Sequence, residues 1–299
     1  MDEIKLIVGY YGRNNIGDDL MLRVLYNPMS YVFLQGDNFY DFIPSEKQIL
    51  LSQKPFLKLV QKIHTLFHLK IKGCTQVVFG GGTQFSSNSK LFTQLDIFIF
   101  VLFCRIFNLR VCAESIGIGA LSKGNIFLIG ALKMTSQISV RDNTSSNKLK
   151  IFNIKHEVVR DLVYKLDFKS KNAKREFTLI TATGPVLKLN DKFTQNFYSF
   201  LETYLKKEDE NIVFCVFQRE EDEYLYEILK QKYPNLEMLE LSSSIQEIEK
   251  VFSKTKQVVG MRYHSLILAD IFDIPFKGFS YDDKVKDLCF LKNMPFHRT

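Results

Sequence analysis

Residues 258–270 read VVGMRYHSLILAD, and this stretch decides the fold. A short apolar run, typical of a buried strand, stops at Gly260, and apolar residues with helical spacing follow His264. A buried strand that ends at glycine and continues into a helix is the repeating unit of α/β domains. The stretch therefore predicts a parallel sheet covered by helices, with Arg262 and His264 directly after the carboxyl end of one strand.

The same alternation extends along the rest of the chain. In the first half, strands are expected at residues 4–10, 75–79, 110–116, 137–140 and 157–159, with helical spacing after residue 20 and over 56–69. In the second half, strands are expected at residues 177–182, 211–218, 236–241, 257–260 and, as the last strand, 276–279, and helices at 191–206, 220–233, 245–253 and 264–272. The predicted class is α/β, with two Rossmann-like domains facing a cleft in a GT-B-like plan.

Length and charge pattern place the domain boundary. A chain of 299 residues fits two domains of ordinary size. The charged stretch 167–176 lacks an apolar period and is interpreted as the linker. We therefore expect an N-terminal domain over 1–168, on the acceptor side, and a C-terminal domain over 175–299, on the donor side.

Composition narrows the classes of partner and compartment. The net charge of +7 favours anionic partners, but the basic stretch 169–175 has no aromatic residue to stack on bases, so nucleic acid is not expected. Five scattered cysteines without a C-x-x-C motif suit a reducing cytoplasm better than a disulfide framework, and the N-terminus has no secretory leader. Within residues 95–109 the unbroken apolar run, 97–104, is too short to span a bilayer, so a buried helix is expected there.

Three motifs carry candidate chemistry, and each has a plainer interpretation. Arg262 and His264 at a helix N-terminus can form an anion-binding site with a proton-transfer group beside it. The plainer interpretation is a capped helix, with the arginine in solvent and the histidine hydrogen-bonded within the protein. Arg141 and Asp142 in SVRDNTS, residues 139–145, stand at a strand end, or form a surface ion pair beside a helix cap. In GYYGRNNIGDD, residues 9–19, an exposed carboxylate could bind sugar hydroxyls or act as a base, or both aspartates simply cap a helix.

Two glycine-rich segments, FGGGTQF over 79–85 and GIGALS over 117–122, are interpreted as tight strand exits that border a ligand. The first lacks the Lys-Ser/Thr of a P-loop and the second lacks the third glycine of a dinucleotide fingerprint. His64 and His68 have the spacing of a metal pair but no accompanying glutamate, so no metal site is expected. Ser115 does not stand in a nucleophile elbow.

Taken in order, these motifs resemble the polysaccharide pyruvyl transferase family. The resemblance runs through GYYGRNNIGDD, FGGGTQF, SIGIGAL, SVRDNTS, Asp161 of VVRDL, GMRYHSLILAD and FSYDDKV over 279–285. It implies a GT-B-like fold, phosphoenolpyruvate as donor, and ketal-pyruvylated sugars of bacterial capsules and exopolysaccharides as products. Asp283 departs from the family, which often has proline there.

The resemblance also implies roles for individual residues. Catalytic candidates are His264, Asp18 and Asp19, and the donor-binding candidates are Arg141, Arg262, His264 and Ser265. Candidates that bind the acceptor or line the cleft are Gly12, Asn15, Gly17, Gly81, Gly82, Thr83, Gly117 and Gly119, and further motif residues are Asp142, Asp282 and Lys284. Phosphoenolpyruvate carries a carboxylate and a phosphate, which suits two arginines and a helix N-terminus, with His264 as the acid.

This scheme needs phosphoenolpyruvate as co-substrate and no metal or organic cofactor. The expected partner is a sugar acceptor, lipid-linked or nucleotide-linked. A cytoplasmic protein is expected, and the positive charge and apolar residues 97–107 raise the hypothesis of peripheral contact with the inner membrane face. Two alternatives remain: a GT-B glycosyltransferase that uses a nucleotide sugar, and a non-catalytic subunit of polysaccharide assembly.

Overall fold

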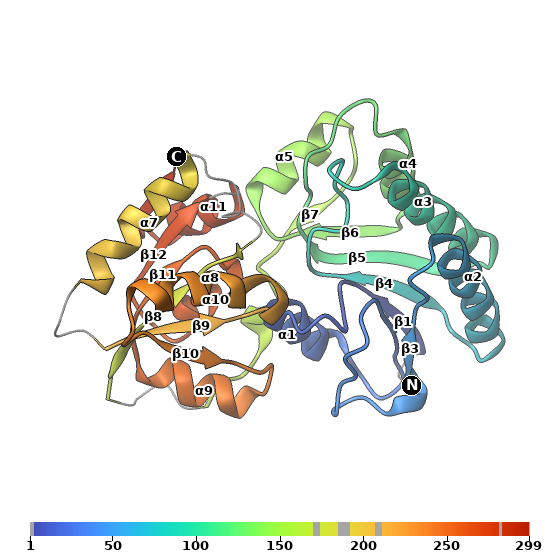
Figure 1. Cartoon of the computed structure of the whole chain (residues 1–299). Helices are drawn as coiled ribbons and strands as arrows, with labels where there is room; N and C mark the ends of the chain where they lie inside the picture. The colour runs from blue at the N-terminus through green and yellow to red at the C-terminus, as the bar shows by residue number, and fades with distance from the viewer. Residues whose placement is uncertain (1–2, 170–173, 185–191, 207–210, 281–282, 299) are drawn as a thin grey trace. The chain divides into compact units, whose positions relative to one another are not determined.

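The computed structural model describes residues 3–169, 174–184, 192–206, 211–280 and 283–298. Within these residues the chain forms two compact units, each built on one parallel sheet (Figure 1). Unit 1 comprises the residues up to Arg13 and Met21–Leu162, and unit 2 comprises Asn14–Leu20 and the residues from Val163 onward. The predicted α/β class with two Rossmann-like parallel sheets is confirmed.

The sheet of unit 1 has the strand order β3-β2-β1-β4-β5-β6-β7. Its strands are β1 (Lys5–Val8), β2 (Tyr31–Leu34), β3 (Gln48–Leu50), β4 (Gln76–Gly80), β5 (Arg110–Ile116), β6 (Gln137–Val140) and β7 (Glu157–Val158). Its helices are α2 (Pro55–Ile71), α3 (Leu91–Ile106), α4 (Ile126–Met134), α5 (Asn143–Ile151) and the short η1 (Ser45–Lys47). Helix α1 (Ile16–Leu25) begins in unit 2 and ends in unit 1.

The sheet of unit 2 has the strand order β10-β9-β8-β11-β12-β13. Its strands are β8 (Phe177–Thr181), β9 (Ile212–Val216), β10 (Glu237–Glu240), β11 (Thr255–Gly260), β12 (Phe276–Ser280) and β13 (Phe296–Arg298). Its helices are η2 (Leu162–Lys165), α7 (Lys192–Leu205), α8 (Arg219–Lys232), α9 (Ile245–Lys254), α10 (Tyr263–Ile271) and α11 (Asp283–Leu291). Every strand pair in both sheets is parallel among the described residues.

In both sheets the strand order reverses beside the first strand of the unit. The reversal lies between β1 and β4 in unit 1 and between β8 and β11 in unit 2. The crossover connections leave these neighbouring strands in opposite directions, so a crevice opens at their carboxyl ends, where open α/β sheets bind ligands. The structure therefore directs attention to the residues that follow β4, β8 and β11.

The core of unit 1 lies where three helices cover one face of its sheet. Helix α3 packs between α2 and α4, and Figure 1 shows the three on the same side of the strands. Phe100 of α3 is almost fully buried, and its ring centroid lies 6.1 Å from those of both Phe33 and Phe79. The strands beneath are short apolar runs because a parallel sheet is covered on both faces.

The structure corrects several predicted elements. Strands β2 and β3 and helices α4 and α11 were not predicted, and β13 follows the strand that was expected to be the last. The two edge strands β3 and β13 have only three residues each, too few for an alternating pattern to stand out. Arg175, near the end of the predicted linker, is anchored in unit 2, since its guanidinium donates hydrogen bonds to the carbonyls of Phe252, Thr255 and Phe272.

The units also divide differently from the expected ranges 1–168 and 175–299. The change from unit 1 to unit 2 falls between Leu162 and Val163, and Asn14–Leu20 belongs to unit 2. The N–H of Ile16 donates to the carbonyl of Phe217 over 3.1 Å, which ties this early segment to the loop after β9. Such a contact joins residues about 200 apart, and local sequence pattern carries no signal for it.

Replacing Phe100 by alanine should test the core of unit 1. The Phe100→Ala variant should lose about 3–5 kcal/mol of unfolding free energy, because a large buried ring leaves a cavity. Phe92 lies on the same helix with 77% of its surface exposed, so Phe92→Ala should change stability by no more than about 0.5 kcal/mol. Urea unfolding measures both, and equal losses would contradict the assignment of the buried face of α3.

Candidate functional site

The first group of candidate residues lies at the strand reversal of unit 2. Strand β11 ends at Gly260, and Arg262 is the N-cap residue of α10, so His264 lies in the first turn of that helix. A side chain at Gly260 would have its Cβ 1.9 Å from the carbonyl oxygen of Thr181, in the neighbouring strand β8. Only glycine allows β8 and β11 to approach this closely at the residue where β11 ends.

Arg262 is held by two carboxylates from the first turn of α8. Its Nη2 donates to Glu221 Oε2 over 2.9 Å and forms a second, shorter ion pair with Asp222. Asp222 is completely buried and also accepts the backbone N–H groups of Phe217 and Gln218. The arginine was expected to be solvated in a cleft, but only 12% of its side chain is exposed. Removal of Arg262 should therefore weaken folding, because Asp222 would be left buried without its cation.

Asp222 balances two opposing effects on its proton affinity. Burial raises the pKa of the carboxyl, while the charge of Arg262 and the two backbone N–H groups lower it by less. The net pKa is above the ordinary aspartate value. Because Arg262 opposes the effect of burial on this carboxyl, the two side chains act as one electrostatic unit.

His264 packs against the backbone of the α1 N-terminus. A Cβ added to Gly17 would lie 1.9 Å from His264 Nδ1, so the glycine lets the ring lie directly on the backbone. Asn15 fixes this segment, because its Oδ1 accepts the Gly17 N–H and its Nδ2 donates to Gln218 Oε1 over 3.1 Å. Asn15 and Gly17 were predicted to bind the acceptor or line the cleft in the N-terminal domain; the structure places both in unit 2, with Gly17 against His264.

The remaining candidates of unit 2 are less accessible than expected. Asp18 and Asp19 lie in the first turn of α1 with 9% and 5% of their surfaces exposed, so the expectation of an exposed carboxylate there is wrong. A helix N-terminus favours carboxylates, which accounts for their position. Ser265 is buried, and its hydroxyl donates to the carbonyl of Arg262 and bonds Thr181 Oγ1. Lys284 lies in α11, and Asp282 lies outside the described residues.

The second group of candidates lies at the carboxyl edge of the sheet in unit 1. Arg141 follows β6 directly and is 8% exposed. Its Nη1 donates to Asp161 Oδ2 over 3.0 Å, and its Nη2 lies 3.5 Å from Thr83 Oγ1. Asp142 caps α5 by accepting the N–H of Ser145. The expected surface pair of Arg141 with Asp142 is therefore a loose 4.0 Å contact, and the buried partner is Asp161.

The glycines of unit 1 surround this arginine or shape the strand exits. Gly117 packs against both Thr83 and Arg141, and its N–H donates to the carbonyl of Gly82 over 2.8 Å. Gly81 follows β4 and packs against Met21, and Gly119 packs against Ser86. Gly12 lies where two backbone segments cross, with its N–H bonded to the hydroxyl of Tyr40. Thr83, Gly117 and Arg141 are thus brought together, while Gly12 has a structural contact of its own.

Sequence reasoning missed the two carboxylates that hold Arg262. Glu221 and Asp222 belong to an acidic run at the start of α8, a pattern that usually marks a solvated first turn. The pairing with Arg262 spans about 40 residues and depends on β9 and β11 lying on either side of β8 in the sheet. Only the sheet order reveals it.

The described residues contain no group of three or more histidine, cysteine, aspartate or glutamate side chains that could hold a metal ion. His64 and His68 lie on the exposed side of α2 with their Nε2 atoms 3.1 Å apart. In the part of the chain that the structure covers, no helix is both long and apolar enough to cross a membrane.

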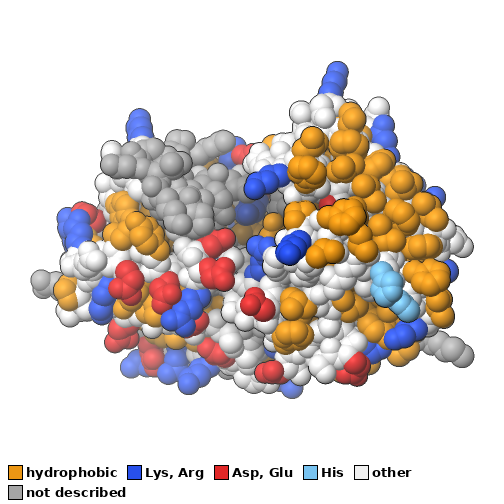
Figure 2. Space-filling model, turned by 45° about the vertical axis from the view of Figure 1, so that its right-hand side comes forward, with side chains coloured by type: hydrophobic (Ala, Val, Ile, Leu, Met, Phe, Trp, Pro, Cys, Tyr) orange, Lys and Arg blue, Asp and Glu red, His pale blue; other side chains and the backbone are white. Residues whose placement is uncertain are grey.

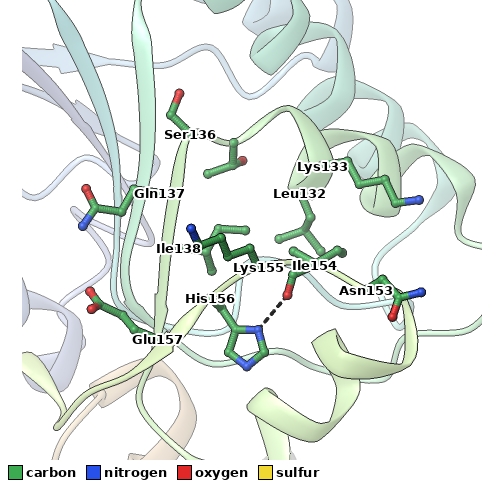
Figure 3. A pocket seen from close by; sticks show the side chains of 11 residues that line it. Leu132, Lys133, Ser136, Gln137, Ile138, Asn153, Ile154, Lys155, His156 and Glu157 are labelled. Carbon is green, nitrogen blue, oxygen red and sulfur yellow. Dashed lines mark hydrogen bonds between the residues drawn. The ribbon is translucent and has the colours of Figure 1, made fainter.

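A cavity of about 470 Å³ opens elsewhere in unit 1 (Figure 3). It lies at the first residues of β6 and β7, lined by Lys133, Gln137, Asn153, Lys155, His156 and Glu157 among others. Both nitrogens of the His156 ring are engaged, with Ser146 Oγ and the Ile154 carbonyl. Because Arg141 follows the last residue of β6, the cavity lies at the opposite edge of the sheet from the candidate residues.

Comparison with known proteins adds a family and a fold. The family model for polysaccharide pyruvyl transferase matches residues 15–283. No curated protein sequence matches the chain. Among solved structures, UDP-GlcNAc 2-epimerase from Methanocaldococcus jannaschii aligns with a TM-score of 0.64 at 12% identity, over 100% of this chain and 89% of that one.

Two further solved structures share the fold. A putative UDP-N-acetylglucosamine 2-epimerase from Listeria monocytogenes aligns with a TM-score of 0.65 at 10% identity, over 97% of this chain and 82% of that chain. MurG from Acinetobacter baumannii aligns with a TM-score of 0.50 at 11% identity, over 99% of this chain and 86% of that chain. These neighbours have the GT-B fold, which confirms the predicted fold; at such low identity they carry no further argument.

Replacing Arg262 by alanine should destabilise unit 2. Because Asp222 would be left buried without its cation, the unfolding free energy should fall by about 3–5 kcal/mol. On α8, the helix that carries Asp222, the exposed Arg219 pairs with Glu223, so Arg219→Ala should leave the unfolding free energy nearly unchanged. Chemical denaturation at neutral pH measures the unfolding free energy of both variants. Equal small losses would show that Arg262 and Asp222 do not form a buried ion pair.

The Arg262→Ala loss should depend on pH. The pKa of Asp222 is higher in the folded protein than in the unfolded chain, where it is about 3.9. Its protonated form therefore adds to the free energy of unfolding in full below the unfolded pKa. This contribution is lost as the pH rises through the folded pKa. Without Arg262 the folded pKa rises further, so the loss should be larger at about pH 8 than at about pH 5. If the variant loses the same unfolding free energy at both pH values, the ionisation of Asp222 is not the cause of that loss.

Proposed function

Because the chain belongs to the polysaccharide pyruvyl transferase family, it is a transferase, and we propose that it moves the pyruvyl group of phosphoenolpyruvate onto a sugar of a surface polysaccharide or its precursor. The observation that carries this proposal is the position of Arg262 and His264 at the N-terminus of α10, where the strand order of unit 2 reverses. A cation, a helix N-terminus and a titratable ring at one strand end suit a small dianionic donor.

The proposed reaction forms a ketal and releases phosphate. Two sugar hydroxyl oxygens bond to C2 of phosphoenolpyruvate, and the bond from C2 to the phosphate oxygen breaks. One hydroxyl proton ends on the C3 methylene carbon, which becomes a methyl group, and the other ends on the departing phosphate. Both transfers are acid–base steps, so we propose no metal or organic cofactor beyond the co-substrate.

Arg262 is proposed to bind the donor while Asp222 keeps it in place. Glu221 is one-third exposed whereas Asp222 is fully buried, so an incoming anion can replace Glu221 on the guanidinium without disturbing Asp222. Exchange of one carboxylate for another anion leaves the charge of the buried unit balanced. Arg141 belongs to unit 1, where it pairs with Asp161. Its contact with the donor stays a prediction.

His264 is proposed as the proton donor to C3 or to the departing phosphate. Its ring lies on the backbone of Gly17, which limits the positions the imidazole can take. A fixed ring keeps its proton within hydrogen-bond reach of a reacting atom, which is what general acid catalysis requires. The burial of Asp18 and Asp19 removes them from our proposal as the base.

We also propose a bacterial, cytoplasmic setting in capsule or exopolysaccharide assembly. The five cysteines are all free and buried, and burial raises the pKa of Cys289 to about 11, so its thiol stays protonated. Unpaired cysteines are typical of proteins from reducing compartments.

Phosphate release tests the activity. The protein is incubated with phosphoenolpyruvate and with polysaccharide repeat units carried on lipid, on nucleotide or on neither, and phosphate and the ketal-modified sugar are measured. The proposal predicts phosphate in a one-to-one ratio to ketal, only when an acceptor is present. Sugar transfer from a nucleotide donor with no use of phosphoenolpyruvate would instead favour a glycosyltransferase.

Removing the imidazole should reduce turnover more than donor binding. The His264→Gln variant should lose about 10²–10⁴-fold in kcat, because a general acid contributes that much. Its dissociation constant for phosphoenolpyruvate should change far less, since Arg262 and the helix N-terminus carry the anion contact. Calorimetry and phosphate release separate the two quantities, and an unchanged kcat would show that the ring only packs against Gly17.

Crowding the imidazole should have a similar effect without removing it. In Gly17→Ala the new Cβ would overlap His264 Nδ1, so the ring must move and kcat should fall by about tenfold or more. A Cβ added to Gly124 would lie 3.8 Å from Ser122 Oγ, an ordinary van der Waals distance, so Gly124→Ala serves as the matched control and should keep full activity. If kcat in Gly17→Ala equals that of the control, the glycine does not position the histidine.

A further inference from the structure

Helix α2 is apolar on two sides, and only one of them faces the core. Leu66 and Leu69 are buried against the sheet of unit 1. Phe56, Val60, Phe67 and Ile71 are all exposed, and their spacing of 4, 11 and 15 residues places them along one side of the helix. An amphipathic surface helix normally turns polar residues outward. The second apolar stripe of α2 therefore needs a partner of its own.

Helix α3 repeats this arrangement beside α2. Phe100, Val101 and Cys104 face the core, whereas Leu91, Phe92, Leu102 and Ile106 are exposed on the other side. We call the two stripes together the docking face; its members are Phe56, Leu57, Val60, Phe67 and Ile71 of α2, Leu91, Phe92, Leu102 and Ile106 of α3, and Ile126 of α4. Figure 2 shows hydrophobic side chains gathered over this side of unit 1, with lysine and arginine side chains at their edges.

The charge on these three helices has one sign. Helices α2, α3 and α4 carry the basic residues Lys58, Lys62, Lys70, Arg105 and Lys133. Their only acidic residue is Asp96, which pairs with the buried Lys62. Lys54, Lys72 and Lys90 flank the helix ends. An exposed apolar face bordered by cations, with its single carboxylate already neutralised, is complementary to an anionic surface that has an apolar interior.

We propose that the docking face binds the surface of an anionic lipid bilayer. The helices are too short to span the hydrocarbon, since a spanning helix needs about 20 apolar residues. Interfacial helices instead lie along the membrane plane with apolar side chains among the acyl chains and Lys or Arg among the headgroups. Of the expected contact at residues 97–107, Leu102 and Ile106 lie on the docking face, whereas Ile97, Phe100, Val101 and Cys104 are in the core.

This inference does not depend on the proposed reaction, because lipid binding is measured without turnover. If the proposed function also holds, docking would bring unit 1 to the surface that carries lipid-linked sugars. A protein that docks but releases no phosphate would contradict the proposed function alone, whereas an active protein that does not dock would contradict this inference alone.

The chain contains no tryptophan, so a single introduced tryptophan reports by its fluorescence on the position where it is placed. Phe92→Trp places a single indole on the docking face, and Phe290→Trp places one on α11 of unit 2, at a position with similar exposure, 70% against 77%. Both proteins are mixed with phosphatidylcholine vesicles, with and without phosphatidylglycerol, whose acyl chains carry bromine. The emission of Phe92→Trp should shift to the blue and be quenched by the anionic vesicles, and that of Phe290→Trp should not. Equal quenching of both, or of neither, would overturn the proposal.

A second pair of variants separates docking from self-association. The Phe56→Ser/Phe92→Ser double variant should partition to anionic vesicles about tenfold less or weaker still, with an unchanged thermal midpoint, while Phe290→Ser should bind like the wild type. Sedimentation velocity is measured alongside. If the wild type ignores vesicles but forms a dimer that the double variant lacks, the docking face joins two copies of the chain and the bilayer proposal is wrong.

Discussion

Each sheet of this protein carries a largely buried arginine just beyond the end of one of its strands, and a buried aspartate must neutralise it. Asp161 does so for Arg141 in unit 1, and Asp222 does so for Arg262 in unit 2. Parallel strands with crossover helices end along one edge, so the residues that follow them gather there whatever their distance in the chain. Isolated charges cannot be buried at such an edge, but paired ones can, and the pairing fixes the geometry of the cation.

The fold was largely predictable because its signals are local. Gly260 after an apolar run, and a helical pattern after His264, indicate a strand and a helix without knowledge of the rest. The edge strands β3 and β13 escaped prediction because three residues carry no period. The assignment of Asn14–Leu20 to unit 2 also escaped, because it depends on a hydrogen bond between Ile16 and Phe217.

The candidate site was predictable in its residue types but not in its contacts. Motif order pointed to Arg141, Arg262 and His264, and the structure places the last two together at one strand reversal. It could not be foreseen that Asp222 holds the arginine or that Gly17 carries the histidine ring, since both contacts join segments distant in sequence. The exposed apolar stripe of α3 was hidden for a related reason: its sequence is apolar all round, and only the packing shows which side remains outside.

The central claim is that Arg262, held by Asp222, is the cation that binds phosphoenolpyruvate. Calorimetric titration of phosphoenolpyruvate into the wild type and into Arg262→Lys tests it most directly, because lysine keeps the charge beside Asp222 but loses the guanidinium fork. Charge-assisted hydrogen bonds contribute about 1.5–3 kcal/mol each, so the account predicts binding weaker by about tenfold to a hundredfold. The same affinity in both proteins would contradict it.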